Sequence, residues 1–276
     1  YNTALSSARV GAHHAATTFY GNEVLSDNPA AYYRLGETSG PTAYNFGNLD
    51  TTVDGTYEGG SAPGAGGLIA TNGNTAASFD GAAGGTSRVA IPDSPGINTT
   101  PDDARAIGLW FQPGSDVTSR QVVYEQGGAG NGYNIYIQDG EVIVGAWKDN
   151  GGTFAKFLSA PISANQKYHA ALVFDADNDA FTGYLNGSVF DTTTGIGTQN
   201  AHVGDIAIGA MRNDSRFDNG GSGEGGSGAG FGFAGTIDEV AVYNTALAPV
   251  RMGLHNARAE YHSNEVLIDD PTVFLR

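Results

Sequence analysis

Residues 231–247 read FGFAGTIDEVAVYNTAL, and this stretch decides how the rest of the sequence is interpreted. Its apolar residues alternate with small or polar ones, which is typical of a β-strand with one buried face. Its ending, YNTAL, also forms the first five residues of the chain. The two copies begin at Tyr1 and Tyr243, a shift of 242 residues, and the shift holds without a gap over residues 1–34 and 243–276.

Identical residues are spread along this whole overlap. They are Leu5 and Leu247, Arg9 and Arg251, Gly11 and Gly253, His13 and His255, Asn22 and Asn264, Glu23 and Glu265, Val24 and Val266, Leu25 and Leu267, Asp27 and Asp269, Pro29 and Pro271, and Arg34 and Arg276. So long a register predicts one period of a tandem array in a large protein. We therefore expect residues 1–21 to be the tail of a preceding repeat, residues 22–247 to form the domain, and residues 248–276 to lead into the next repeat.

The composition predicts an all-β domain. The 276 residues include 42 Gly, and only 15% are charged, which favours short strands joined by tight turns. The formal net charge of −16 argues against nucleic acid and anionic membranes as partners. No run of about 18 apolar residues is present, so membrane insertion is not expected. The absence of cysteine removes disulfides and thiolate chemistry.

Alternating segments after residue 104 predict the strands. The segment YNIYIQDGEVIVGAW contains Asp139-Gly140 between two alternating runs, a strong hairpin signal. In ARAIGLWFQP we expect Trp110 on one face of the strand and Leu109 and Phe111 on the other. Many such strands without long helices between them predict an antiparallel β-sandwich of the jelly-roll type.

Five segments outside this pattern carry separate expectations. Residues 6–18 and 248–260 each predict a short helix, the second with Pro249 in its first turn, where proline is accepted. The GNEVL and SNEVL sequences that follow these helices are expected to be extended. Residues 219–230, NGGSGEGGSGAG, predict a flexible loop.

Seven motifs occur in order between residues 22 and 259: DNPAAYYRLGE, ASFDG, AIGLWFQP, YHAALVFD, YLNG, IAIGA and FAGTIDEVAVYNTAL. As an ordered set they resemble the laminin G-like branch of the concanavalin A-like lectin and glucanase jelly rolls. That family closes its sandwich with a late strand reading G-x-I-D-E-V, which matches Gly235, Ile237, Asp238, Glu239 and Val240. The sequence departs from the pattern in the long Gly loop and at Tyr168, where Trp is usual. The resemblance implies an adhesive or sugar-binding module of bacterial surface and secreted proteins, often with one calcium ion.

Calcium is the expected cofactor. Ca²⁺ is bound by six to eight oxygens from carboxylates, carbonyls and water. The resemblance implies a cation that ties early strands to the late one, with Asp80, Asp238 and Glu37 as ligands. The alternative is that these residues only stabilise turns and strand ends. A second acidic group in FDADNDAF lacks the Gly and Glu of an EF-hand loop and predicts a hairpin turn.

Two segments are candidates for ligand binding. Sugar sites combine aromatic faces with polar groups that fix hydroxyls. Trp147, Lys148 and Asn150 lie at a predicted strand end, where Trp147 is the preferred stacking residue. Arg212, Asn213 and Asp214 begin the rim loop RNDSRFD, which offers groups for hydroxyls or acidic sugars. The alternatives are a core Trp147 and a merely solvated loop.

The sequence predicts no catalytic residues. Hydrolases of this superfamily place carboxylates on one side of a strand in an E-x-D-x-x-E pattern, which is missing here. Asp238 and Glu239 are adjacent and are expected to point to opposite faces. No G-x-S-x-G elbow is present, and the histidines lack metal spacing. The chain is therefore not expected to be an enzyme.

Two functional hypotheses follow. The first is a secreted or cell-surface, calcium-assisted binding module for polysaccharide or glycoconjugate. The second is a structural unit of a fibre, filament or surface layer, in which neighbouring repeats of the same polypeptide are the partners. A binding appendage to an enzyme elsewhere in the same protein is a third possibility. An exposed aromatic pair would favour the first hypothesis, and an apolar contact between repeats the second.

Overall fold

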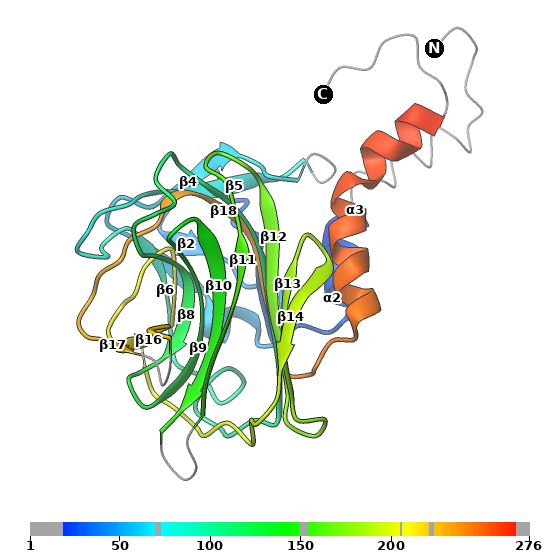
Figure 1. Cartoon of the computed structure of the whole chain (residues 1–276). Coiled ribbons are helices and arrows are strands. Elements are labelled where there is room, and N and C mark those ends of the chain that lie inside the picture. Colours follow the sequence, from blue (N-terminus) through cyan, green and yellow to red (C-terminus); the bar gives the residue numbers. More distant parts are fainter. Residues whose placement is uncertain (1–18, 70–72, 150–153, 205, 221–223, 269–276) are drawn as a thin grey trace, which may run out of the picture.

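The computed structural model describes residues 19–69, 73–149, 154–204, 206–220 and 224–268. Two eight-stranded sheets pack face to face, and helices α2 (Phe19–Ser26) and α3 (Pro249–Ile268) lie beside one of them (Figure 1). Every strand pairing between named strands is antiparallel. The predicted antiparallel jelly-roll sandwich is therefore confirmed. The predicted helix at residues 6–18 lies outside the described residues.

The first sheet contains the late strand that the sequence singled out. In spatial order its strands are β14 (Ser188–Thr193), β13 (Ala180–Leu185), β12 (Tyr168–Asp175), β7 (Ala104–Pro113), β18 (Ala234–Tyr243), β5 (Thr75–Asp80) and β4 (Ala62–Gly66), with β1 (Ala31–Tyr33) paired to β18. The second sheet consists of β11 (Phe154–Pro161), β10 (Glu141–Lys148), β9 (Asn131–Gln138), β8 (Gln121–Gly127), β15 (Ile206–Ile208), β6 (Arg88–Ile91), β3 (Gly55–Glu58) and β2 (Thr42–Ala43). A hairpin of β16 (Ser215–Phe217) and β17 (Glu224–Gly226) and a 3₁₀ turn, η1 (Asp50–Val53), complete the described elements.

The predicted hairpins are present. Asp139 and Gly140 join β9 to β10 with φ angles of 53° and 80°. Two positive φ angles are what a two-residue type I′ turn requires. The acidic FDADNDAF segment forms the turn between β12 and β13, with Asp179 in the left-handed region at φ 50°.

Aromatic and branched side chains fill the space between the sheets. Ile237 and Val240 of β18 belong to this core. Phe174 of β12 is fully buried and packs edge-on against Tyr133 of β9 and parallel to Phe154 of β11, with centroid distances of 5.4 and 5.9 Å. These ring contacts connect the two sheets directly.

The helices cover the outer face of the first sheet. Tyr20 and Val24 of α2 and Met252 of α3 form a second buried cluster with Trp110 and Ala241. Leu109 and Phe111 lie in the core between the sheets. The predicted alternation around Trp110 is confirmed, and its face of the strand is the one under the helices.

Both helices differ from the sequence expectation. GNEVL lies within α2, and SNEVL lies within the second half of α3, so neither is extended. No Gly or Pro interrupts α3 between Gly253 and its end at Ile268. In α2 the packing of Val24 on the sandwich and the ion pairs of Glu23 with α3 favour the helix.

The predicted Gly-rich loop lies next to the outer face of the second sheet. Met211 and Phe217, which precede the loop in the sequence, form a third buried cluster with Val122, Tyr136 and Ile143. Part of the segment forms the β16–β17 hairpin. Part of each sheet's outer face is thus covered by side chains of the chain itself.

We expect Phe174→Ala to lower the free energy of unfolding by about 3–5 kcal/mol, because it removes a ring that fills the space between the sheets. Chemical denaturation monitored by fluorescence measures this change. Val203→Ala, at a side chain with an exposed fraction of 74%, is the control and should change stability by less than about 0.5 kcal/mol. A similar small effect of Phe174→Ala would contradict the packing described.

Candidate functional site

Trp147 does not offer a face to a ligand. Its side chain is fully buried, and its indole N–H donates to the carbonyl of Gly128 at 2.8 Å. The neighbouring Lys148 is also buried and donates from Nζ to the carbonyl of Thr198 at 2.6 Å. The prediction of Trp147 as an exposed stacking residue is wrong, because the strand end is covered by adjacent loops. Asn150 lies outside the described residues.

The RNDSRFD segment is anchored to the second sheet. The backbone N–H of Arg212 donates to Glu125 Oε1 at 3.1 Å, and an ion pair joins Arg216 to Asp149. The structure thus brings this segment next to the end of β10. Asn213 is exposed and Asp214 is half-buried. The role of Arg212, Asn213 and Asp214 in ligand binding stays a prediction.

The three predicted calcium ligands do not meet. Asp80 is exposed, and its Oδ1 accepts the backbone N–H of Ala82 in a tight turn. The register of β18 on β5 places Ala234 opposite Asp80, four residues from Asp238, or about 13 Å along the strand. The Glu37 carboxylate accepts hydrogen bonds from the Tyr44 backbone N–H and the Tyr57 hydroxyl, both at 2.9 Å. Over the ranges that the structure covers, no three His, Cys, Asp or Glu side chains form a metal-binding group.

A β-bulge places Asp238 and Glu239 on the same side of β18. Asp238 pairs with Trp110 and Ala241 with Gly108, so two residues of β18 lie opposite one of β7. Glu239 has a φ of 54°, in the left-handed region that the extra residue requires. The flanking Ile237 and Val240 both point into the core. The expectation that the two carboxylates point to opposite faces is therefore wrong.

Segments far apart in the sequence bind this buried acidic pair. Glu239 accepts a hydrogen bond from the Tyr32 hydroxyl, one from Asn74 Nδ2 at 3.2 Å, and forms an ion pair with Arg34 at 3.4 Å. Asp238 Oδ2 accepts the backbone N–H of Leu68 at 2.9 Å. Asp238 Oδ1 is buried and has no hydrogen-bond partner within the described part of the chain.

The environment of the pair disfavours two full negative charges. Burial, and secondarily repulsion from Glu239, raise the pKa of Asp238 well above its usual range. Burial also raises the pKa of Glu239, although Arg34 and the Tyr32 hydroxyl oppose this shift. Two carboxylates that repel each other in a low-dielectric site favour either a bound proton or a bound cation. Asp238 Oδ1 has no hydrogen-bond partner in the described part of the chain, whereas the Asp80 and Glu37 carboxylates are engaged elsewhere.

A surface pocket lies next to this network. Its volume is about 390 Å³, and it is lined by Arg34, Gly36, Glu37, Thr38, Ser39, Tyr44, Phe46 and Asn74. Arg34 and Asn74 thus contact Glu239 below and line the pocket above. A Cβ at Gly36 would lie 1.8 Å from Asn74 Oδ1, so a larger residue at this position would displace the Asn74 side chain.

Tyr44 and Phe46 form an exposed aromatic pair at this pocket. Each side chain has an exposed fraction of 51%. Between them, Asn45 is buried, and its Oδ1 accepts the backbone N–H groups of Tyr32 and Gly47 at 2.7 and 3.0 Å. Its Nδ2 donates to the carbonyl of Asp50 at 2.9 Å. These bonds fix the loop so that the two rings stay at the surface.

Sequence reasoning missed this pair. It considered aromatic residues on regular strands, and most of these are buried in the sandwich. The available signal was the segment AYNFGN, in which two aromatic residues flank an Asn within a Gly- and Asn-rich loop. Asn commonly bonds the backbone of its own turn, which places its neighbours on the outside.

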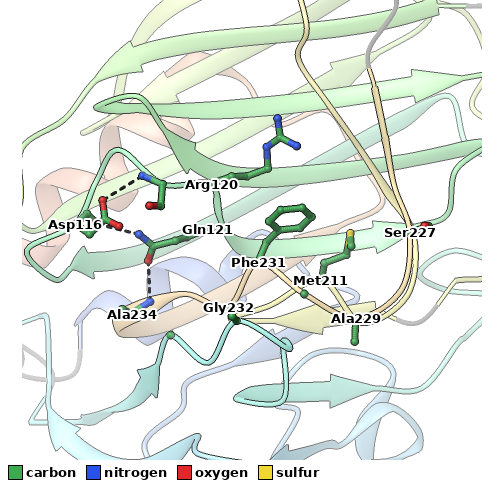
Figure 2. A pocket seen from close by; sticks show the side chains of 13 residues that line it. Asp116, Arg120, Gln121, Met211, Ser227, Ala229, Phe231, Gly232 and Ala234 are labelled. Atoms are coloured by element: carbon green, nitrogen blue, oxygen red, sulfur yellow. Dashed lines mark hydrogen bonds between the residues drawn. The ribbon is translucent and has the colours of Figure 1, made fainter.

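A larger hollow of about 530 Å³ lies between β8 and the Gly-rich segment (Figure 2). Arg120 stacks over the rings of Phe217 and Phe231, with its guanidinium carbon 4.3 and 5.4 Å from their centroids. The Gln121 side-chain amide donates from Nε2 to the Asp116 carbonyl and accepts the Ala234 N–H at Oε1, as the dashed lines in Figure 2 show. Arg120 covers the two rings, and the Gln121 amide already makes hydrogen bonds within the chain. The Tyr44–Phe46 pocket is therefore the better candidate site.

The buried pair makes a prediction about pH. A carboxyl group whose pKa is raised on folding stabilises the protein most below its unfolded pKa of about 4, and this stability is lost as pH rises through the folded pKa. The loss is about 1.4 kcal/mol per unit of pKa difference. In EDTA, Asp238→Asn should therefore unfold at higher denaturant concentration than the wild type at pH 7, with a smaller difference at pH 4. A wild-type advantage at pH 7 would contradict the buried repulsion.

None of the helices in the described ranges is long and apolar enough to span a bilayer.

Comparisons with known proteins agree with this architecture. Residues 83–250 match the model of a laminin G family described as the concanavalin A-like lectin/glucanases superfamily. No curated protein matches the chain.

Similar solved structures include toxin binding domains. The binding domain of botulinum neurotoxin serotype D has a TM-score of 0.60 at 9% identity, over 89% of this chain and 53% of that one. The binding domain of Paraclostridial Mosquitocidal Protein 1 has a TM-score of 0.61 at 13% identity, over 84% and 52%. A serotype D ligand binding domain in complex with N-acetylneuraminic acid has a TM-score of 0.58 at 8% identity, over 89% and 53%. The chain spans about half the length of these structures, and the likeness shows the fold. The family match covers more than half of the chain, which belongs to the laminin G-like family of the concanavalin A-like lectin/glucanase superfamily.

Proposed function

We propose that the chain is an extracellular, non-catalytic module that binds carbohydrate at the Tyr44–Phe46 pocket. The observation that carries this proposal is the pair of half-exposed aromatic rings held by Asn45 beside a polar pocket. Aromatic faces pack on the C–H groups of a sugar ring, and nearby polar groups fix the hydroxyls. A rigid loop also lowers the entropy lost on binding.

The polar groups of the pocket suit hydroxyls. Thr38 and Ser39 are exposed and line the pocket together with Glu37 and Asn74. Hydroxyl and amide groups both donate and accept, whereas the Glu37 carboxylate accepts. This mixture matches a sugar, whose hydroxyls both donate and accept.

The charges favour an uncharged sugar. Arg34, with a side-chain exposed fraction of 31%, is paired with Glu239. The Glu37 carboxylate lines the same pocket, and the whole chain has a net charge of −16. An anionic ligand would meet repulsion that is only partly offset by Arg34. We therefore place neutral polysaccharides ahead of acidic ones.

Other observations support binding rather than catalysis. Asp238 and Glu239 are buried, so no substrate reaches them in this state. The solved structures with this fold include binding domains, one of them in complex with a sugar. These neighbours support the class of function, and the ligand of this chain is our proposal.

The test is a panel of neutral and sialylated glycans, followed by titration calorimetry with the ligand found. Tyr44→Ala and Phe46→Ala should each weaken binding at least tenfold, about 1.4 kcal/mol, because each removes one stacking face. Their stability should change by less than about 0.5 kcal/mol, since the rings are half exposed.

Two variants serve as controls for this titration. Val203→Ala removes an exposed apolar side chain outside the pocket, and Arg120→Gln alters the larger hollow. Both should bind as the wild type does. Normal affinity of both aromatic variants, or loss of binding in Arg120→Gln alone, would move the site away from Tyr44 and Phe46.

We also propose that calcium binds at the buried acidic pair. The support is chemical: two adjacent carboxylates and the unpartnered Asp238 Oδ1. A cation there would tie β18 to the segments around Leu68 and Arg34, which already contact the pair. It would stabilise the module and the base of the sugar pocket.

Calcium should raise the melting temperature of the wild type relative to EDTA, and Asp238→Ala should abolish this shift. Asp80→Ala is the matched control and should keep it, because Asp80 lies about 13 Å along the sheet. Differential scanning calorimetry in both buffers measures the effect. A full calcium response in Asp238→Ala would exclude this residue as a ligand.

A further inference from the structure

Residues 19–34 form a docking segment that consists of α2, a turn and β1. Tyr20 and Val24 of α2 are 1% exposed against the outer face of the first sheet. The Tyr20 hydroxyl accepts the indole N–H of Trp110 at 2.9 Å. β1 is fully buried and pairs with β18 through Tyr32 opposite Ala241.

Charged residues fasten this segment to α3. Arg251 contacts Glu23 Oε1 at 2.6 Å and Asp27 Oδ1 at 2.7 Å. His255 Nε2 lies 2.8 Å from Asp27 Oδ2, and Arg258 Nε lies 3.4 Å from Glu23 Oε2. All four carboxylate oxygens of Glu23 and Asp27 therefore have a partner on α3. The contacts lower the pKa of Asp27, although burial opposes the shift. At the end of the segment, Arg34 pairs with Glu239.

The sequence of this segment occurs a second time. Residues 19–34 read FYGNEVLSDNPAAYYR, and residues 261–276 read YHSNEVLIDDPTVFLR. The charged docking residues are retained as Glu265, Asp269 and Arg276, and the buried β1 residues AYY are replaced by VFL, which are also apolar. The repeat thus retains the charged residues and the apolar character of the β1 residues. The hydroxyls of Tyr20 and Tyr32, which bond Trp110 and Glu239, are lost because these residues become His262 and Phe274.

Within this copy, residues 19–34 already occupy the surface on which such a segment docks, which we call the seat. Arg251, His255 and Glu239 contact Glu23, Asp27 and Arg34. α3 is continuous to Ile268, and its C-terminal part extends away from the sandwich (Figure 1). A continuous helix cannot return to its own first turns. The part of the second docking sequence that lies on this helix, residues 261–268, therefore cannot reach Arg251 and His255 of its own copy.

We propose that residues 261–276 dock on a second copy of this domain, in the seat that residues 19–34 occupy here. In that arrangement α3 of one copy supplies the α2 of the next, and a single helix joins consecutive sandwiches. The contact is heterologous, so repeated copies form an open array unless the rotation between them closes a ring. This inference does not rest on the proposed sugar binding, although Arg34 of the docking segment also lines the Tyr44–Phe46 pocket.

The test compares the same substitutions in two chains. One is residues 1–276; the other is residues 1–276 followed directly by residues 35–276, which keeps the register because Arg276 takes the place of Arg34. The tandem chain should contain two folded sandwiches. Glu265→Ala with Asp269→Ala should leave the melting temperature of the single chain unchanged and should lower that of one sandwich in the tandem chain.

Glu23→Ala with Asp27→Ala in the single chain is the matched reference. It should lower the melting temperature by the same amount as the equivalent pair lowers it in the tandem chain. Calorimetry, with limited proteolysis to assign the transitions, measures both. Destabilisation of the single chain by Glu265→Ala with Asp269→Ala would show docking in the same copy and overturn the proposal. An unfolded second sandwich, or no effect in the tandem chain, would also overturn it.

Discussion

The buried bulge of β18 is the constraint on which the rest of the structure depends. It turns Asp238 and Glu239 to one side, where neither charge can be left alone in a low dielectric. Arg34, Asn74 and the backbone of Leu68 therefore converge on them from the N-terminal third of the chain. The same convergence builds the floor and walls of the surface pocket, so fold closure and the candidate site have one physical origin.

The elements that cover the outer faces of the two sheets decide which part of the surface stays open to a ligand. Helices α2 and α3 bury the outer face around Trp110, and the segment around Phe217 packs on the other sheet. Large aromatic residues on the strands are thereby used for packing between layers. Tyr44 and Phe46 stay exposed because they lie in a loop in which the buried Asn45 side chain hydrogen-bonds the backbone groups of Tyr32 and Asp50. Binding at a loop on a rigid scaffold is a common arrangement.

The proposed sugar pocket and the proposed docking segment share one residue, Arg34, which lines the pocket and ends the segment. Tyr44 and Phe46 lie outside the docking segment, and α2 and α3 meet along the outer face of the first sheet. The two hypotheses raised by the sequence are therefore compatible in one protein. A linear array would display the pocket at regular intervals, and several weak sites on one array gain avidity.

The sequence alone determined the class of fold, because alternation, turn residues such as Asp139-Gly140 and the ordered motifs are local properties. It also determined the internal repeat. It did not place Trp147, whose burial depends on loops distant in the chain, nor α2, which depends on contacts with α3. Only the tertiary structure decided that Asp238 and Glu239 share one face and that Asp80 lies apart from them. A bulge of one residue reverses the side on which a strand residue points, and no local pattern in this sequence announces it.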